Sequence, residues 1–332
     1  MPNNQKLLLS SRRAVAGTLI AALVGVLGSC GTNTNADPDA ASWSPTRPIT
    51  IIVPAGPGGG SDQMARQAAK VMEQVDPKAT IVVENVQGGG GAAGITAFLK
   101  RPDDGYTYLQ VPAADVSLIL TQNRVNASLK DFAMIGRMQS GPAVVVGNAH
   151  DPRFSDYKEM IAYMKESNEP LKAALYIPEG FDDLTLAAIE KKEGVKFTRV
   201  PYTDAGERFT ALLSGRADVL LQRFGDIKQY VDSGDMVPLV SDYDEPPSSL
   251  SSVATFKDLG IQFDLDYSRG FWADAEAPSD AIQYMRDLVE KAATSKAWVE
   301  PESKRGYIDG YLEPDPWLAK LKEAQKVFAS AY

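Results

Sequence analysis

Short apolar runs alternate with amphipathic stretches along most of the chain. Residues 49–53 read Ile-Thr-Ile-Ile-Val, a continuous apolar run typical of a parallel strand that is covered on both faces. A helix is predicted to follow, because apolar residues recur at helical spacing from Ser61 and Asp62 to Pro77. Further strands are expected at 80–83, 106–111 and 133–138, with a helix at 92–99. This order predicts a doubly wound, mostly parallel sheet.

The same pattern starts again near residue 142. Strands are expected at 142–146, 172–176, 197–201, 218–221 and 237–241, and helices at 155–166, 184–190, 206–214, 224–233, 279–294 and 316–332. We therefore predict an α/β protein with two lobes, each a doubly wound mostly parallel sheet. Lobe 1 is expected to comprise residues 46–142 and 266–332, and lobe 2 residues 143–265. A cleft between the carboxyl ends of two such sheets is typical of a hinged small-molecule receptor.

The N-terminal segment has the pattern of an export signal. Lys6, Arg12 and Arg13 precede the uncharged stretch 14–29, which is too short to span a bilayer comfortably. Cys30 ends this stretch after Val-Leu-Gly-Ser, which resembles a bacterial lipoprotein lipobox. We expect residues 1–29 to be a signal peptide and Cys30 to carry the lipid. The paired arginines leave twin-arginine and general secretory export both open.

The segment at 30–45 is rich in Asn, Thr, Asp, Ala, Ser and Pro and has no apolar periodicity, so we expect a flexible tether there. The protein that this signal and tether predict is extracytoplasmic, in the periplasm or at the cell surface, and anchored to the membrane by its lipid.

Charge and rare residue types narrow the possible functions. The chain of 332 residues has 34 Lys and Arg against 43 Asp and Glu, and no long basic run, which argues against a nucleic-acid partner. A single Cys and a single His exclude a disulfide framework, a zinc cluster and most catalytic triads. We expect neither a metal site nor enzyme activity.

Glycines gather where two of the predicted strands run into helices. Gly56 and Gly58–Gly60 follow the first strand, and Gly88–Gly91 follow the second. Backbone amides at such junctions can bind anions, although glycine also serves simple tight turns. A dinucleotide fold is a competitor, but the sixth position of G-x-G-x-x-G holds Ser61 or Gln63, so no cofactor is expected. An exported enzyme with a nucleotide cofactor is the weaker alternative.

An ordered set of segments resembles the periplasmic receptors of tripartite tricarboxylate transporters, the Bug-type solute-binding proteins. The matching segments are P-I at 48–49, I-V-P at 52–54, G-G-G-S-D at 58–62, A-R at 65–66, V-E-N at 83–85 with the second glycine run, V-P-Y at 200–202, L-S-G-R-A-D-V-L at 213–220, 256–260, Trp272 and A-P at 277–278. The resemblance covers about residues 46–332. It implies a two-lobed Venus-flytrap fold of the periplasmic-binding-protein type.

The same resemblance implies what the protein does. Receptors of this family capture small organic acids and deliver them to integral-membrane transporter subunits, without catalysis. We expect a monomer with a small carboxylate ligand. A receptor that feeds a sensor kinase instead of a transporter is the alternative.

Two loops, one on each lobe, are expected to close on the ligand. The resemblance and the local pattern together give the candidate ligand-binding residues Ala55, Gly58, Gly59, Gly60, Ser61, Asp62, Asn85, Pro178, Glu179, Gly180, Tyr202 and Arg223. Asp62 is expected to cap the helix and order the glycine loop. Tyr202 either donates its hydroxyl to the ligand or packs at the hinge. Arg223 either binds a ligand carboxylate or is a surface residue that pairs with Asp226.

The second-lobe loop departs from the family pattern. The family has Gly and Ser there, whereas this chain has Pro178, Glu179 and Gly180, with Asp182 and Asp183 close behind. Three carboxylates would repel an anion unless they point outward, cap the helix or meet an ammonium group on the ligand. The sequence therefore leaves an amino acid or an uncharged aromatic compound open as the substrate.

Overall fold

The computed structural model describes residues 43–202, 205–243, 247–261, 267–308 and 310–331. The expected signal peptide and Cys30 lie outside these residues. Trp43, near the end of the expected tether, packs against the rings of Tyr106 and Tyr284, with ring centroids 5.1 Å apart in each pair. Across the described ranges, no helix combines the length and hydropathy needed to cross a membrane.

The first sheet has five strands in the order β2-β1-β3-β11-β4. Their bounds are β1 Ile49–Val53, β2 Ile81–Asn85, β3 Thr107–Pro112, β4 Phe132–Gln139 and β11 Arg269–Asp274. β1 runs parallel to β2 and β3, whereas β11 is antiparallel to both β3 and β4. The sheet is thus mostly parallel, with one inserted antiparallel strand from the C-terminal part of the chain.

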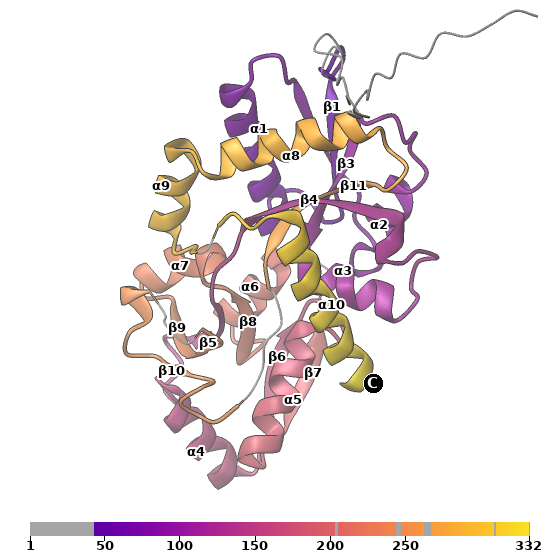
Figure 1. The fold of residues 1–332 in the computed structure, drawn as a ribbon. Coiled ribbons are helices and arrows are strands. Elements are labelled where there is room, and N and C mark those ends of the chain that lie inside the picture. The colour runs from indigo at the N-terminus through magenta and orange to yellow at the C-terminus, as the bar shows by residue number, and fades with distance from the viewer. Residues whose placement is uncertain (1–42, 203–204, 244–246, 262–266, 309, 332) are drawn as a thin grey trace, which may run out of the picture. The chain divides into compact units, whose positions relative to one another are not determined.

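Helices cover both faces of this sheet, which explains the continuous apolar run of β1. Ile49, Ile51 and Val53 pack in one core cluster and Ile52 in the other. The first face is covered by α1 (Gly60–Val75), α8 (Ser279–Ala293) and α9 (Lys296–Arg305), and the second by α2 (Ala92–Phe98), α3 (Ala113–Thr121) and α10 (Pro314–Ala331). In Figure 1, α1 and α8 lie next to each other, in agreement with their many contacts.

The second sheet has six strands in the order β10-β9-β5-β8-β6-β7. Their bounds are β5 Ala143–Asn148, β6 Leu171–Leu175, β7 Phe197–Pro201, β8 Val219–Arg223, β9 Met236–Ser241 and β10 Ala254–Thr255. β6 is parallel to β7 and β8, and β10 to β9, while β5 is antiparallel to β8 and β9. Each sheet therefore contains one antiparallel strand, β11 in the first and β5 in the second. Each of these two strands is the first one that the chain forms after it crosses from the other sheet.

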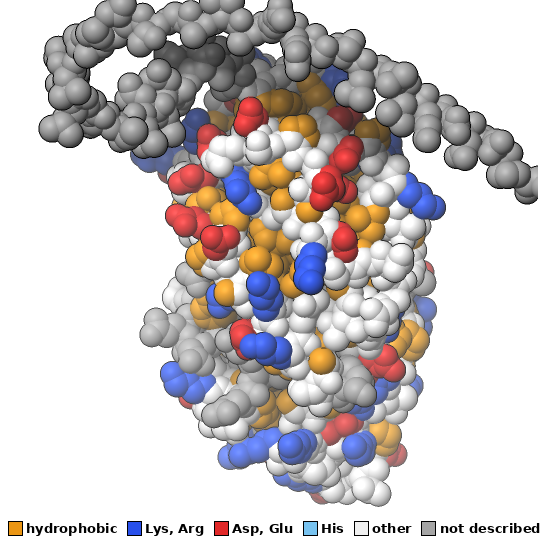
Figure 2. Space-filling view, turned by 45° about the vertical axis from the view of Figure 1, so that its right-hand side comes forward, with side chains coloured by type: hydrophobic (Ala, Val, Ile, Leu, Met, Phe, Trp, Pro, Cys, Tyr) orange, Lys and Arg blue, Asp and Glu red, His pale blue; other side chains and the backbone are white. Residues whose placement is uncertain are grey.

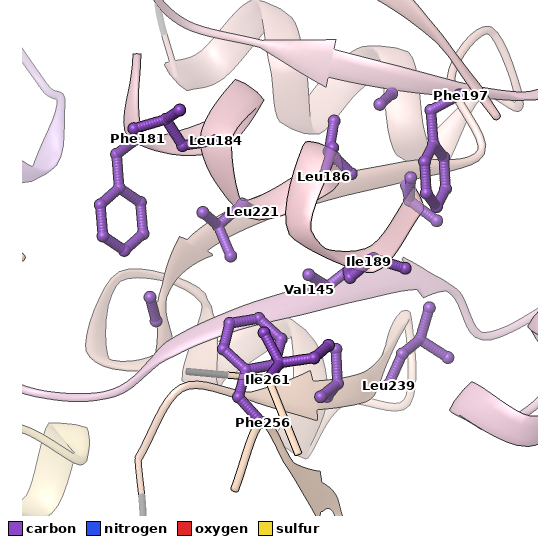
Figure 3. Close-up of a cluster of buried hydrophobic side chains, with 14 of the residues drawn as sticks. Val145, Phe181, Leu184, Leu186, Ile189, Phe197, Leu221, Leu239, Phe256 and Ile261 are labelled. Carbon is purple, nitrogen blue, oxygen red and sulfur yellow. The ribbon is translucent and has the colours of Figure 1, made fainter. Parts of the chain in front are cut away.

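The second sheet is also buried on both faces. One face packs against α4 (Tyr157–Ser167) and α5 (Phe181–Glu193), and the other against α6 (Ala205–Leu213) and α7 (Phe224–Asp232). Figure 3 shows Leu186 and Ile189 of α5 beside Val145 and Leu221 of the sheet. This alternation of strands and helices is the doubly wound arrangement that the apolar pattern predicts.

Two helices contribute to apolar clusters on both sheets. α3 gives Leu118 to the core of the second sheet and Ile119 to the core of the first. α10 does the same with Phe328 and Leu321. These shared helices bury apolar surface between the two sheets.

The surface carries both signs of charge. Figure 2 shows acidic and basic side chains spread over one face, with apolar patches between them. Val82, Leu213 and Val299 are the large apolar side chains exposed among the described residues.

Candidate functional site

The first glycine loop joins β1 to α1 and is held by Asp62. Gly58 has a φ of +82°, which favours glycine, and its N–H donates 2.8 Å to Asp62 Oδ2. The N-cap of α1 is Gly59, without a side-chain cap. Asp62 therefore orders the loop as predicted, but the prediction that it caps the helix is wrong, because it lies within the first turn. Burial raises the Asp62 pKa, yet hydrogen bonds from Arg66 and Gly58 outweigh burial and lower it.

Asn85, at the end of β2, ties this loop to the neighbouring strand. Its Nδ2 donates to the carbonyl of Ala55 at 3.1 Å, and its Oδ1 accepts from Arg66 Nη2 at 3.0 Å. Arg66 also lies 2.9 Å from Asp62 Oδ1. Both polar ends of the Asn85 side chain are thus used to brace the loop.

The second glycine loop meets the opposite sheet. Gly88, Gly89, Gly90 and Gly91 all have positive φ, so the loop is a chain of conformations that other residues rarely adopt. A Cβ on Gly90 would lie 3.1 Å from Ile177 Cγ1, on the loop between β6 and α5. The second-sheet loop therefore packs directly on the first sheet's glycines.

The acidic residues of the loop between β6 and α5 are already neutralised by protein partners. Glu179 accepts from Gln122 Nε2 at 2.8 Å and lies 3.6 Å from Arg124, both just after α3. Asp183 accepts from the Glu179 N–H at 3.2 Å and from Arg199 Nε at 2.8 Å. These carboxylates stabilise the loop, and Glu179 also binds residues of the opposite lobe. Their charges are paired, so they do not repel an anion in the way that the sequence alone suggested.

Asp182 is the buried member of this acidic group. Its Oδ2 accepts from the Tyr176 N–H at 3.0 Å and lies 3.4 Å from Arg208 Nη2, which is also buried. Arg208 further donates to the carbonyl of Leu221, in the middle of β8. Burial raises the Asp182 pKa, with Arg208 opposing it.

Pro178 and Gly180 shape the same loop through their backbones. The Gly180 N–H donates to the Ile177 carbonyl at 3.1 Å, and a Cβ there would lie 2.8 Å from that oxygen. The Pro178 carbonyl accepts from Arg124 Nη2 at 3.3 Å. The loop is thus a closed turn, and its Gly180 and Glu179 amides are engaged within it.

A buried ion pair lies against the start of α1. Asp226, in the first turn of α7, bonds Arg269, the first residue of β11, at 2.7 Å. Its Oδ1 and Oδ2 would lie 2.6 Å from a Cβ on Gly60, so only glycine fits there. Tyr307 Oη also donates to Asp226. Burial raises the Asp226 pKa, but Arg269 outweighs burial and holds it below its ordinary value.

Arg223 is not the surface partner of Asp226. It is 3% exposed, and it donates through Nε to the Tyr267 carbonyl at 2.6 Å and through Nη2 to the Ser268 carbonyl at 3.4 Å. Its guanidinium stacks on the Tyr267 ring at 3.6 Å. The predicted surface pairing is wrong, because Asp226 forms its ion pair with Arg269. Arg269 is not among the candidate residues identified from the sequence. Arg223 instead holds the chain where it returns to the first sheet, and its Nη1 makes no hydrogen bond to any residue that the structure describes.

The structure also shows the surroundings of three other residues that the sequence singles out. Tyr202 packs against the apolar cluster under α6 and α7, which favours its packing role. Trp272 is fully buried within β11, in the core of the first sheet. His150 is exposed in a turn, 3.6 Å from Asp235. The described residues contain no group of three or more His, Cys, Asp or Glu side chains placed to hold a metal ion.

Several polar groups have no hydrogen-bond partner among the residues that the structure describes. Gln110 of β3 is fully buried with both amide atoms unbonded, and Arg269 Nε is also without a partner. Asp115, in the first turn of α3, makes no hydrogen bond or ion pair with any described residue. Sequence reasoning missed these residues because it predicted neither the helix α3 nor the strand β11. A polar Gln within an apolar strand was the available signal.

Comparison with known proteins places this geometry in a family. Residues 64–322 match the model of the tripartite tricarboxylate transporter family receptor. The chain is 26% identical to Protein BugT of Bordetella pertussis over 306 residues, which cover 90% of this chain and 91% of that protein.

Solved structures of the same fold agree. MatC from Rhodopseudomonas palustris with bound malate superposes with a TM-score of 0.75 at 19% identity, covering 86% of this chain and 99% of that one. An R. palustris protein with adipate superposes with a TM-score of 0.78 at 19% sequence identity. The match covers 86% of this chain and 96% of that one. The predicted two-lobed periplasmic-binding-protein fold is confirmed. The match to the family model spans most of the chain, and the protein therefore belongs to the receptor family of tripartite tricarboxylate transporters.

Proposed function

We propose that the protein is an extracytoplasmic receptor that captures a small organic carboxylate between its two lobes. The observation that carries this proposal is the meeting of the β1–α1 glycine loop with buried arginines from the return crossing. Arg269 lies against Gly60, and within the described part of the chain Arg223 makes hydrogen bonds through Nε and Nη2 but none through Nη1. Loop amides and guanidinium groups are the donors that a carboxylate requires.

The family and its relatives support the ligand class. The two solved structures named above hold malate and adipate, both small dicarboxylates. This chain shares their fold, so the space between its lobes is the natural place for such a ligand. We propose no catalytic step.

Binding energy of the required size is available only when both lobes take part. A helix N-terminus contributes at most ~2 kcal/mol to an anion, whereas micromolar affinity needs about 8 kcal/mol. Charge-assisted hydrogen bonds of about 1.5–3 kcal/mol each from Arg223 and from loop amides of both lobes supply the rest. Only a closed arrangement makes all of them, so the ligand favours closure.

The proposal assigns the lobes and the site residues as follows. Lobe 1 comprises residues 46–142 and 266–332, and lobe 2 residues 143–265, with hinge crossings beside Pro142 and Ser268. Gly59, Gly60 and Ser61 hold the ligand through their backbone, while Gly58, Asp62, Asn85 and Ala55 keep that loop in shape. Pro178–Gly180 close over it from lobe 2.

Delivery and anchoring complete the proposal. The receptor is attached to the membrane through a lipid on Cys30, acts as a monomer, and passes its ligand to integral-membrane transporter subunits. Deleting the receptor gene should abolish uptake of the radiolabelled ligand, and the intact gene should restore it. Uptake that persists in the deletion strain would contradict delivery.

Thermal unfolding of the ligand-free mature protein tests the binding proposal. We would screen mono-, di- and tricarboxylates, together with uncharged analogues of the same carbon skeletons. A ligand that binds only the native state must raise the melting temperature. Stabilisation by carboxylates and not by the matched amides or alcohols is the expected result, whereas equal stabilisation by both would overturn the proposal.

A further inference from the structure

Asp115 occupies an unusual position between the lobes. It lies in the first turn of α3, directly after β3, and it is only partly buried. Two residues earlier, the Ala113 N–H donates to the Ser268 carbonyl at 2.9 Å, on the return crossing. Ala114 and Leu118 of the same helix pack in the core of the second sheet. The carboxylate therefore sits where lobe 1 meets the hinge and lobe 2.

The charges around Asp115 are balanced. Burial raises its pKa to about 6, and among opposite charges Arg223 acts on it most strongly, followed by Arg269 and Arg208, while Asp182 acts as a like charge. Arg269 is neutralised by Asp226, and Arg208 faces Asp182. This leaves Arg223 as the one guanidinium of the three without a carboxylate partner, and Asp115 as its unpaired counterpart.

The same place leaves complementary hydrogen-bonding groups unused. Asp115 offers carboxylate acceptors, and Arg223 Nη1 offers donors. Buried polar groups without partners cost stability unless a ligand or water satisfies them. The unused groups thus call for a ligand that both donates and accepts at opposite ends.

From this arrangement we propose that the ligand carries an ammonium group in addition to its carboxylate, with Asp115 binding the ammonium and Arg223 the carboxylate. The inference rests on the proposed carboxylate-receptor function and narrows its substrate class to zwitterions such as amino acids. A dicarboxylate would place a second anion beside Asp115 with no free cation to compensate for it. A zwitterion leaves both the Asp115 and the Arg223 charges paired.

Calorimetric titration with matched probes tests this proposal. The four-carbon series is butyrate, 4-aminobutyrate, 2-aminobutyrate and succinate, and the five-carbon series is valerate, 5-aminovalerate, norvaline and glutarate. Each series varies the ammonium group and the second carboxylate on one skeleton. We expect an amino acid to bind more tightly than the simple acid and the dicarboxylate of its series.

The variant Asp115→Asn should weaken binding of that amino acid at least tenfold and leave the simple acid unchanged. Asp280→Asn is the matched control, because Asp280 is an exposed acid in the first turn of α8. It should bind like the wild type. Thermal unfolding confirms that Asp115→Asn folds, since removing an unpaired carboxylate should not lower its melting temperature.

The possible results separate the two claims. If the dicarboxylate binds most tightly, or Asp115→Asn keeps the amino acid's Kd within twofold, the zwitterion inference is overturned and the carboxylate receptor stands. If no carboxylate of either series binds the wild-type protein, the receptor proposal and the inference both fail.

Discussion

The carboxylate of Asp226 in the second sheet's α7 bonds the guanidinium of Arg269 at the start of the first sheet's β11, at 2.7 Å and with both side chains less than 5% exposed. Tyr307 and Gln222 donate to the same carboxylate. This pair joins the two lobes next to Gly60, at the loop proposed to hold the ligand. The contact between the two sheets and the candidate site therefore share one buried charge network.

Asp226→Asn should lower the free energy of unfolding by about 3 kcal/mol or more, because it leaves Arg269 buried without its counter-charge. Urea unfolding measures the change. Asp232→Asn is the control on the same helix, since Asp232 pairs with Lys228 at an exposed site, and it should cost less than about 1 kcal/mol. Equal effects of the two variants would show that the pair does not stabilise the fold.

Asp62→Ala should free the glycine loop by removing the acceptor of the Gly58 N–H. We expect a loss of about 1–2 kcal/mol in stability, and faster hydrogen exchange at Gly58. Arg66→Ala removes the exposed partner of Asp62 and should have the smaller effect. A larger loss in Arg66→Ala would contradict the role given to Asp62.

Ligand affinity should depend on pH through Asp115. The carboxylate binds an ammonium group only when ionised, and its pKa is raised to about 6, with Arg223, Arg269, Arg208 and Asp182 as the surrounding charges. Affinity for a zwitterionic ligand should therefore fall about tenfold between pH 7.5 and pH 5. Calorimetry at both pH values measures this fall.

The stability effect of Asp115 has the opposite sign. Because its folded-state pKa lies above the unfolded value of 3.8, stability falls as pH rises between 3.8 and about 6. Asp115→Asn should remove both pH dependences. If the affinity of Asp115→Asn falls equally between pH 7.5 and pH 5, a group other than Asp115 causes the pH dependence.

Cys30→Ala should release the protein from the membrane fraction, because the proposed lipid attaches through that thiol. Fractionation followed by immunoblotting detects the release. The intact mass of the wild-type protein should include the added acyl groups. A wild-type mass without them would contradict lipidation.

The sequence predicted the two sheets well because both are buried on each face. Runs such as 49–53 and 143–146 are rich in apolar residues, and the glycine loops mark the strand ends. The strand β11 was not predicted, because its neighbours in the sheet are far away in sequence and its first residue is the charged Arg269. α9 contains Pro301, which weakens a helix pattern.

The candidate site was predictable only where local chemistry determines it. The link from Asp62 to the glycine loop spans four residues, so the sequence indicates it. The partners of Glu179 and Asp226 come from the other lobe, with Gln122 57 and Arg269 43 positions away along the chain. A pattern along the chain cannot reveal which distant arginine takes which carboxylate, and the predicted surface pairing of Arg223 with Asp226 was wrong for that reason.

The most direct test of the central claim compares calorimetric titrations of Gly60→Ala and Gly59→Ala with the carboxylate that most raises the wild-type melting temperature. A Cβ on Gly60 would collide with the Asp226–Arg269 pair, whereas a Cβ on Gly59 would approach no atom closer than 3.7 Å, at the Gly56 carbonyl. If the ligand is held at this loop in the closed protein, Gly60→Ala should weaken binding tenfold or more, about 1.4 kcal/mol, and Gly59→Ala far less. Unchanged affinity in Gly60→Ala would contradict the account and move the binding site elsewhere.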